Sequence, residues 1–394
     1  MGLANMPTGF VYGFISTAFG ILLAARGVPV GRIGEISGVA FSPTFWAWLM
    51  APILDVHFTK RAYAFFFAGL AAVLLGVAVL SLGNLPVFTA TLTASCAAIV
   101  LYSNSVQGWA PDAVSEEDYD AMSGWLNVAN LAAAGLFSTV VIVLVRVLPL
   151  PAAAVCLALL VFAPTALLLY FPAPRKPEGR LKENFAAMAT SLRRVLKEGR
   201  VWVGLLIFIA PVGAFALTNL FSSLGSDFGA SERTVTGLNG LAVAAACGVG
   251  CVLAIPLCRR FRRRSVYLLA GLGASVAAGA MGLLPHTVMV YAVGLLAYNF
   301  FQGFNYTAFT ALELEIIGPQ NALSGTMIAM LTASCNIPIS SMTVIDSKVH
   351  DAHGLRAMLY TDAWVTVATA AVLMLLVLPL LDSYMRRNAK PLVV

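Results

Sequence analysis

The chain has 394 residues, of which 60% are hydrophobic and 11% are charged, and its net charge is +6. Soluble globular domains are about a quarter charged, so this chain has too few charged residues to cover a water-facing surface. The composition excludes an ordinary soluble protein and indicates a chain whose solvent is the lipid bilayer. The positive charge falls in loops between apolar runs, where it sets orientation in a membrane and does not indicate nucleic-acid binding.

Twelve apolar runs, each bounded by charge, Pro or Gly, are long enough to cross a bilayer, which takes about 20 residues as a helix. The first run lacks a basic leader segment, so we expect it to be an uncleaved span. The sequence predicts an all-α membrane protein with twelve transmembrane helices, at 7–25, 33–54, 62–82, 86–110, 121–146, 150–171, 201–224, 233–257, 265–284, 287–312, 322–345 and 357–381.

The basic residues are divided unequally between the two sides of this topology. Twelve spans place both termini on one side, and that side then carries 18 Lys and Arg residues against 6 on the other. Because cytoplasmic loops are enriched in Lys and Arg, we expect both termini in the cytoplasm. Short loops and the lack of long tails favour a bacterial inner membrane.

One long polar segment divides the chain. We predict an N-terminal six-helix bundle over 1–171, a cytoplasmic linker over 172–200 and a C-terminal six-helix bundle over 201–394. Within the linker, Phe185, Met188 and Leu192 recur at helical spacing beside Arg193 and Arg194. That pattern is typical of a basic amphipathic helix lying on the inner leaflet; the alternative is a solvated connection.

The two predicted bundles repeat each other's motifs. The fourth and tenth spans carry Gln107-Gly108 and Gln302-Gly303, the fifth and eleventh open with Ser123-Gly124 and Ser324-Gly325, and prolines 52 and 256 stand near the ends of the second and eighth. Parallel six-span repeats are characteristic of the major facilitator fold, in which one bundle rocks against the other around a central cavity. We expect two pseudo-symmetric bundles.

Short motifs also resemble one branch of that superfamily. The chain is similar to the muropeptide permease (AmpG-type) and acetyl-CoA transporter branch in three segments: Ala51-Pro52-Ile53-Leu54-Asp55 before Lys60-Arg61, Gln107-Gly108-Trp109-Ala110-Pro111-Asp112-Ala113, and Gln320-Asn321-Ala322-Leu323-Ser324-Gly325. In the second segment, Gly108 stands where the family has the first aspartate of its motif. The resemblance implies uptake of a muropeptide or amino sugar.

Polar and aromatic residues within the spans predict a solute site. Polar groups in hydrocarbon face a bundle interior or water, and in the tenth span Asn299, Gln302 and Tyr306 share one helical face. Amides and rings with no Lys or Arg at mid-membrane suit a polar, uncharged organic solute; helix-to-helix bonding is the alternative. The predicted solute-contacting residues are Tyr102, Asn104, Gln107, Trp109, Asn127, Asn130, Asn219, Tyr298, Asn299, Gln302, Asn305, Tyr306 and Asn336.

Charged residues near the span ends predict a gate. Asp55 followed by Lys60 and Arg61 resembles the acidic–basic loop between the second and third spans of the superfamily, which latches one state. We therefore assign gating or coupling roles to Asp55, Lys60, Arg61, Asp112 and Glu313, and a proton site at the outer rim to Glu35. Interfacial charges without such a role are the alternative.

Acidic residues are expected near the span ends and not at mid-span. We expect a flexible outer loop, rather than a metal site, at Asp346, His350, Asp351 and His353. Six cysteines in apolar surroundings read as small packing residues, and we expect no cofactor.

The sequence favours a transporter over three other classes of membrane protein. It contains no HExxH, GxSxG or CxxC motif, so we expect no enzyme, and no filter-like segment indicates a channel. A receptor or scaffold of the same fold stays open, as do siderophore or drug cargo, proton coupling and the direction of transport. Expected partners are the solute and membrane lipids, without nucleic acid, and we expect a monomer.

Overall fold

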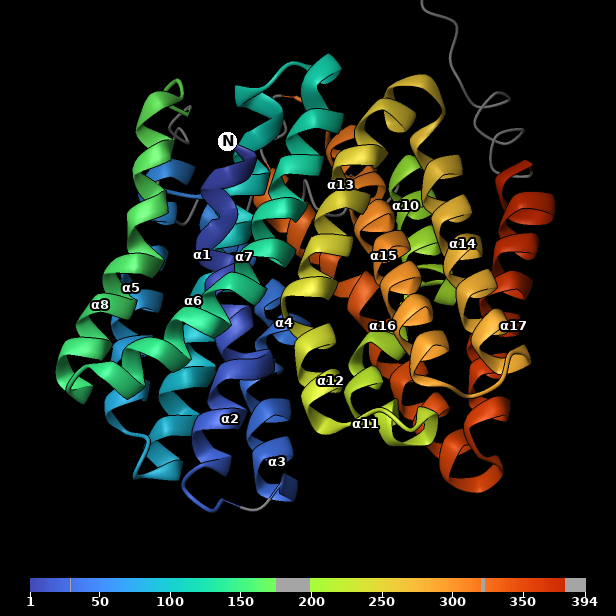
Figure 1. The fold of residues 1–394 in the computed structure, drawn as a ribbon. Helices are drawn as coiled ribbons and strands as arrows, with labels where there is room; N and C mark the ends of the chain where they lie inside the picture. Colours follow the sequence, from blue (N-terminus) through green and yellow to red (C-terminus); the bar gives the residue numbers. More distant parts are fainter. Residues whose placement is uncertain (29, 175–198, 320–322, 380–394) are drawn as a thin grey trace, which may run out of the picture.

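The computed structural model describes residues 1–28, 30–174, 199–319 and 323–379, and within these ranges every regular element is a helix (Figure 1). The predicted linker helix lies outside the described residues. The first half, residues 1–174, contains η1 (Gly2–Asn5), α1 (Met6–Gly13), η2 (Phe14–Ala18), α2 (Phe19–Ala24), α3 (Val30–Phe41), α4 (Pro43–Trp46), η3 (Ala47–Leu49), η4 (Ala51–Asp55), α5 (Lys60–Leu80), α6 (Leu85–Ala113), η5 (Glu116–Asp118), α7 (Tyr119–Val147), α8 (Leu150–Phe162) and η6 (Ala163–Tyr170).

The second half, residues 199–379, follows the same course. Its elements are α10 (Gly199–Ile209), η7 (Pro211–Gly213), η8 (Ala216–Asn219), α11 (Phe221–Leu224), η9 (Gly225–Phe228), α12 (Glu232–Gly237), η10 (Leu238–Ala242), α13 (Val243–Arg260), α14 (Arg263–Leu283), α15 (Val288–Ile317), α16 (Ser324–His353), α17 (Leu355–Val372) and η11 (Leu373–Val377).

All twelve predicted spans have helical counterparts in the described residues. Nine helices there are long and apolar enough to cross a membrane. The three spans that fall short are the second and seventh, which are broken into short pieces, and the tenth, where Asn299, Gln302 and Asn305 lower the hydropathy of α15. The fold class predicted from the sequence is confirmed.

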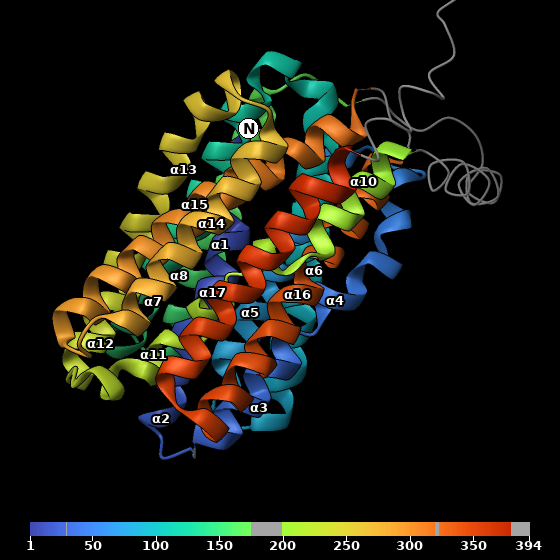
Figure 2. The same ribbon diagram turned by 90° about the vertical axis from the view of Figure 1, so that its right-hand side faces the viewer.

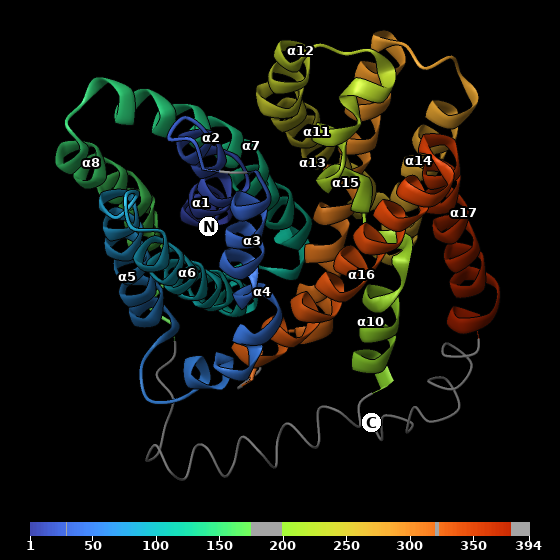
Figure 3. The same cartoon turned by 90° about the horizontal axis from the view of Figure 1, so that it is seen from below.

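The hydrophobic cores follow the division into halves. One cluster of buried side chains takes all but one of its members from residues 4–168, and two others draw only on residues 201–378. The halves touch chiefly where α7 packs on α13 and α15, and where α16 packs on α4, η4 and α6. Seen from below, the two halves lie side by side (Figure 3). In the side view, most of the long helices run in roughly the same direction (Figure 2).

The seventh span is interrupted at its centre. α10 ends at Ile209, the backbone turns extended at Ala210, and Pro211 has no amide hydrogen with which to continue the helix. Phe215 then adopts a left-handed conformation with φ of 47°, which a residue with a side chain rarely occupies. Irregular backbone at membrane depth is tolerated where protein or a water-filled cavity satisfies it, so this break marks a position buried in the interior.

The loops between the helices lie at the two ends of the bundle. We call one end the basic end, because the predicted topology gives its side 18 of the 24 Lys and Arg residues: it carries the loops around residues 55–60, 114–118 and 261–262 and the end of α15 at 317–319, and the start of the chain lies there too (Figure 1). The other end, called the opposite end, carries the turn at Gly27 and the loop at 284–287.

The predicted loop at Asp346–His353 is wrong. α16 continues through these residues to His353, and Asp346 is completely buried. The apolar run in the sequence stops near residue 345, but the helix continues. It can continue because its polar residues there face neighbouring helices of the same half. Among the described residues, no group of three or more His, Cys, Asp or Glu side chains could hold a metal ion.

Candidate functional site: an inter-half gate and a polar face

At the basic end, the start of α16 is capped by a carboxylate from the other half. The Asp55 side chain, 1% exposed, accepts hydrogen bonds from the backbone N–H of Gly325 at 3.0 Å, from that of Thr326 at 2.8 Å and from the Thr326 hydroxyl at 2.6 Å. A carboxylate is favoured at a helix N-terminus, where unpaired N–H groups and the helix dipole are directed at it. Asp55 thus joins the two halves.

Lys60 completes this contact. Its ammonium lies 3.6 Å from Asp55 Oδ1 and donates to the Ser324 hydroxyl. Burial raises the pKa of the Asp55 carboxyl, while Lys60 and the hydrogen bonds from Thr326 and Gly325 oppose that rise. The neighbouring Arg61 lies half-buried at the start of α5.

A second contact repeats this arrangement with the halves exchanged. Arg263, at the start of α14, donates from Nε to Asp120 Oδ1 at 2.7 Å and from Nη2 to Oδ2 at 3.3 Å, and its Nη1 lies 3.0 Å from Glu315. Asp120 belongs to the first turn of α7, and both partners are mostly buried, at 16% and 4% exposure. A bidentate Arg–carboxylate pair fixes the relative orientation of the two side chains and also stabilises their contact.

The two contacts follow the internal repeat. In the first, the loop after the second span meets the start of the eleventh; in the second, the loop after the eighth meets the start of the fifth. A weaker pair, Arg259 with Asp118 at 3.8 Å, lies exposed beside the second contact. The sequence motif predicted a gating role for Asp55 beside Lys60 and Arg61, which stays a prediction, but neither the contact of Asp55 with α16 nor the pair of Arg263 and Asp120 was anticipated.

Glycines bring the halves together at the first of these contacts. A Cβ at residue 108 would lie 2.9 Å from both the N and the Cα of Gly325. That separation is shorter than real Cβ contacts allow, so α6 and α16 can meet here only because residue 108 lacks a side chain. Gly108, which stands where the resembled branch has an aspartate, is thus explained by close backbone contact.

Two amides predicted to contact solute bridge the halves instead. Asn127 of α7 donates to the Tyr306 carbonyl and to the Thr310 hydroxyl of α15, both at 3.0 Å. Asn336 of α16 donates to the Thr44 carbonyl at 3.0 Å. Both residues join the two halves, and solute contact by them stays a prediction.

The polar face of α15 lies beside the break in the seventh span. Gln302 donates to the Tyr306 hydroxyl at 3.4 Å and accepts from the Cys247 thiol at 3.7 Å. Asn299 accepts from Thr218, which follows the left-handed Phe215, at 3.4 Å. The Asn299 amide nitrogen also donates to the Leu295 carbonyl at 2.8 Å, so the weak bonds on this face, which another partner can replace, are the two of 3.4 Å.

Other members of the predicted set lie in the packed interior of the first half. Tyr102 and Trp109 are fully buried: the Tyr102 hydroxyl donates to the Ala4 carbonyl, and Trp109 packs edge-on against Phe171. Gln107 donates to Ser103 at 2.8 Å within α6. The buried amide nitrogen of Asn104 has no hydrogen-bond acceptor among the described residues.

Three further amides join helices within one half. Asn130 accepts from Asn5 at 2.8 Å, and Asn305 donates to the Tyr267 carbonyl of α14 at 2.9 Å, away from the face of Asn299 and Gln302. Asn219 is exposed and donates to Thr343 at 3.2 Å. Their places show helix packing, and contact with solute stays a prediction.

The remaining predicted charges lie apart from one another. Glu35 forms an exposed ion pair with Arg32 at 2.6 Å, and Asp112 is exposed at the end of α6. Glu313 is completely buried in α15, where one oxygen accepts from Thr332 at 3.0 Å and the other has no donor among the described residues. The gating and coupling roles assigned to these three residues stay predictions.

Comparison with known families decides the classification. The family model of the Major Facilitator Superfamily matches residues 1–343. The chain belongs to the Major Facilitator Superfamily. No curated protein matches it.

Solved structures of the superfamily share this fold. The proton:xylose symporter XylE superposes with a TM-score of 0.71 at 15% identity, over 95% of this chain and 93% of that one. The Escherichia coli fucose:proton symporter FucP gives 0.67 at 16%, over 94% and 97%. A bacterial homologue of the iron transporter ferroportin, in its outward-facing state, gives 0.71 at 14%, over 95% and 96%. Membership in this superfamily makes the chain a membrane transporter by fold and family.

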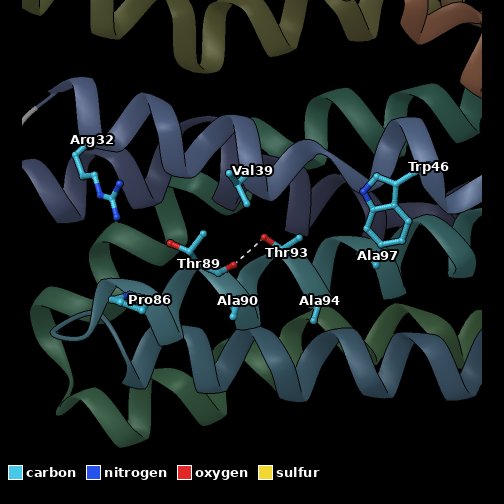
Figure 4. Close-up of a pocket in the computed structure, with 9 residues that line it drawn as sticks. All are labelled: Arg32, Val39, Trp46, Pro86, Thr89, Ala90, Thr93, Ala94 and Ala97. Atoms are coloured by element: carbon cyan, nitrogen blue, oxygen red, sulfur yellow. Dashed lines mark hydrogen bonds between the residues drawn. The ribbon is translucent and has the colours of Figure 1, made fainter.

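One open groove lies away from the gate of this superfamily member. It has a volume of about 570 Å³ between α3–α4 and α6 (Figure 4), and its walls are mainly apolar, formed by Arg32, Val39, Trp46, Pro86, Thr89, Ala90, Thr93, Ala94 and Ala97. None of the predicted solute-contacting residues lines it.

Sequence reasoning overlooked a carboxylate in this superfamily member. Asp362, 3% exposed in α17, accepts from the Tyr298 hydroxyl at 3.2 and 3.3 Å. The expectation that acidic residues lie only near span ends is therefore wrong for Asp362, and the signal was a lone aspartate inside an apolar run.

Proposed function

We propose that this chain is a secondary active transporter that moves a polar, uncharged organic solute by alternating access. A muropeptide or amino sugar is the favoured cargo, from the motif resemblance. The observation that carries the proposal is the face of α15 formed by Asn299, Gln302 and Tyr306, which lies beside the break in the seventh span and whose bonds from Thr218 and to Tyr306 are long, at 3.4 Å. Amides both donate and accept without charge, which suits hydroxyl and acetamido groups.

In this proposal the gate sets which side of the membrane reaches the solute. With Asp55 and Arg263 both engaged, the basic end is closed, and solute enters from the opposite end. Rocking the halves as two rigid bodies, divided at the linker 172–200, breaks both contacts and opens the basic end. The unequal distribution of Lys and Arg supports placing the basic end in the cytoplasm of a bacterial cell, and we propose that a monomer suffices.

Ligand binding tests the cargo. The purified transporter is screened by thermal shift against muropeptides, N-acetylglucosamine, ferric siderophores and nucleotides. Stabilisation by the first two supports the proposal, because a ligand that binds only the folded state raises the melting temperature. Stabilisation by siderophores or nucleotides alone would contradict the proposed cargo.

A substitution then tests the site. Gln302→Ala should lower counterflow of the bound solute in proteoliposomes at least tenfold while the amount of folded protein changes little, because the polar face loses both a donor and an acceptor. The matched control is Asn84→Ala, which removes an amide that caps α6 and costs about 1 kcal/mol of stability without touching α15. Equal loss of folding and counterflow in Gln302→Ala would make Gln302 a packing residue.

A further inference from the structure

Two carboxyl groups and a phenol meet inside the second half, where α15, α16 and α17 pack together. The Tyr298 hydroxyl donates to Asp362 at 3.2 Å, and the carboxyl groups of Asp346 and Asp362 interact directly with each other. Exposure is 1% for Tyr298, 0% for Asp346 and 3% for Asp362. The proposed solute site and gate use neither aspartate.

The surroundings of this cluster supply no positive charge. Among the described residues, neither aspartate forms an ion pair, and neither oxygen of Asp346 meets an N–H or hydroxyl donor. Tyr298 from α15 hydrogen-bonds to the pair, and His350, which is bonded to Asp227 from η9, follows Asp346 by one turn of α16. One turn away on the same helix faces, Met342 on α16 and Met358 and Thr366 on α17 are buried.

Two adjacent carboxylates in so dry a place cannot both be ionised. Like charges that share one site repel strongly at low dielectric, and a carboxyl pair then holds one proton between its members. A metal ion fits less well, because hard cations such as Ca²⁺ take six to eight oxygen ligands. The cluster offers two carboxyl groups and a hydroxyl that is already donating.

The pair has a route to the opposite end of the bundle. His350 follows Asp346 by four residues on α16, so the two side chains share a face about one turn, or roughly 5 Å, apart. The His350 ring is 31% exposed and its Nε2 lies 3.0 Å from Asp227, which is itself 35% exposed. An imidazole carries one nitrogen that donates and one that accepts a hydrogen bond, so His350 is placed to pass protons between water and the pair.

The pair also touches the break in the seventh span. The Tyr298 ring lies 5.4 Å from that of Phe215, the residue with left-handed backbone. Phe215 in turn contacts Tyr306, and Asn299 follows Tyr298 directly in α15. A change in the hydrogen bond of Tyr298 can therefore alter the packing of Phe215 and Asn299 at the proposed solute site.

We propose that Asp346 and Asp362 form a proton-binding site, which holds one proton against Tyr298, is loaded from the opposite end through His350, and couples to the seventh span at its break. The coupling rests on the proposed transport function, whereas proton binding by the pair does not. Proton carriage in this chain is thereby assigned to the tenth, eleventh and twelfth spans.

Infrared spectroscopy of the purified protein in lipid tests proton binding directly, because protonated and ionised carboxyl groups absorb at separate frequencies. The wild type is compared at neutral pH with the double variant Asp346→Asn/Asp362→Asn. The difference spectrum should contain one protonated carboxyl and one carboxylate, and other buried acids such as Glu313 cancel. Glu117→Gln, an exposed acid at the basic end, should remove a carboxylate alone. Two carboxylates in the first difference would overturn the proposal.

Single variants keep the test decisive if the double variant does not fold. Asp346→Asn and Asp362→Asn preserve shape, and in each the remaining carboxyl should lose its proton at a lower pH than the pair does, because its like-charged neighbour is gone. An unchanged titration in both would overturn the shared proton. A band shift produced by Na⁺ or Ca²⁺ at constant pH would show a cation site instead, and would also overturn it.

Transport separates this proposal from the proposed function. For a solute found by the ligand screen, Asp362→Asn should retain counterflow and lose the stimulation of uptake by a pH gradient. Unaltered stimulation would overturn the coupling. If the wild type moves none of the solutes, the proposed function fails, and the spectra still decide whether the pair holds a proton.

Discussion

Removing the charge of Asp55 should open the basic end. In Asp55→Asn one acceptor oxygen, the attraction to Lys60 and part of the cap on α16 are lost. A hydrogen bond to a charged group contributes about 1.5–3 kcal/mol and a helix cap about 1 kcal/mol. The Asp55 side chain is 1% exposed, so water does not screen these terms, but the amide retains some of the bonds. We expect the closed state to lose about 2–3 kcal/mol, which is roughly a 30- to 150-fold shift in the ratio of closed to open molecules.

Distance measurements across the gate test this expectation. Spin labels at the exposed positions Phe58 and Pro319, one in each half, report the separation of the halves at the basic end. The distribution should move to longer distances in Asp55→Asn, with slower counterflow and retained ligand binding. Asp118→Asn is the matched control, because its ion pair with Arg259 is exposed and such pairs contribute about 0–1 kcal/mol. An unchanged distribution in Asp55→Asn would refute the capping argument.

Three further substitutions probe the contacts between the halves. Gly108→Ala puts a Cβ 2.9 Å from the backbone of Gly325, and we expect about 1–3 kcal/mol of strain in the closed state. The distance between the two spin labels should then increase as it does in Asp55→Asn. A distance equal to that of the wild type would mean that α6 and α16 can separate without cost. Arg263→Gln leaves buried Asp120 without its partner, so the melting temperature should fall by an amount equivalent to about 3–5 kcal/mol, and a drop no larger than that of Arg259→Gln would contradict the buried pair. Asn127→Ala removes two bonds to α15, and a loss of about 1–2 kcal/mol in chemical denaturation is expected; no loss would show that these bonds contribute nothing to stability.

The spans and one half of the gate could be predicted from the sequence because both leave local signals. Apolar runs mark the helices, and Asp55 before Lys60 stands out as charge beside an apolar end. The partner of Asp55 could not be predicted, since it is the backbone of Gly325 and Thr326, some 270 residues away, and backbone amides carry no sequence signature.

The buried acids show where hydropathy fails. Asp346 lies beyond the last apolar residue of its run and was predicted to be a loop, yet α16 continues because neighbouring helices, rather than lipid, cover its polar face. The break in the seventh span had a visible signal in Pro211, but a proline alone does not tell a kink from an interruption. Which amides of α15 point at solute and which at α14 depends on tertiary packing.

The carboxylate that completes α16 is supplied by the other half of the molecule. In a second half synthesised alone, the first backbone N–H groups of that helix would lack their acceptor. In a first half synthesised alone, the Asp55 carboxylate would lack its hydrogen-bond donors. If the two were expressed as separate polypeptides, each would present the group that the other lacks. The gate would then also serve as the recognition surface through which the fragments reassemble in the membrane.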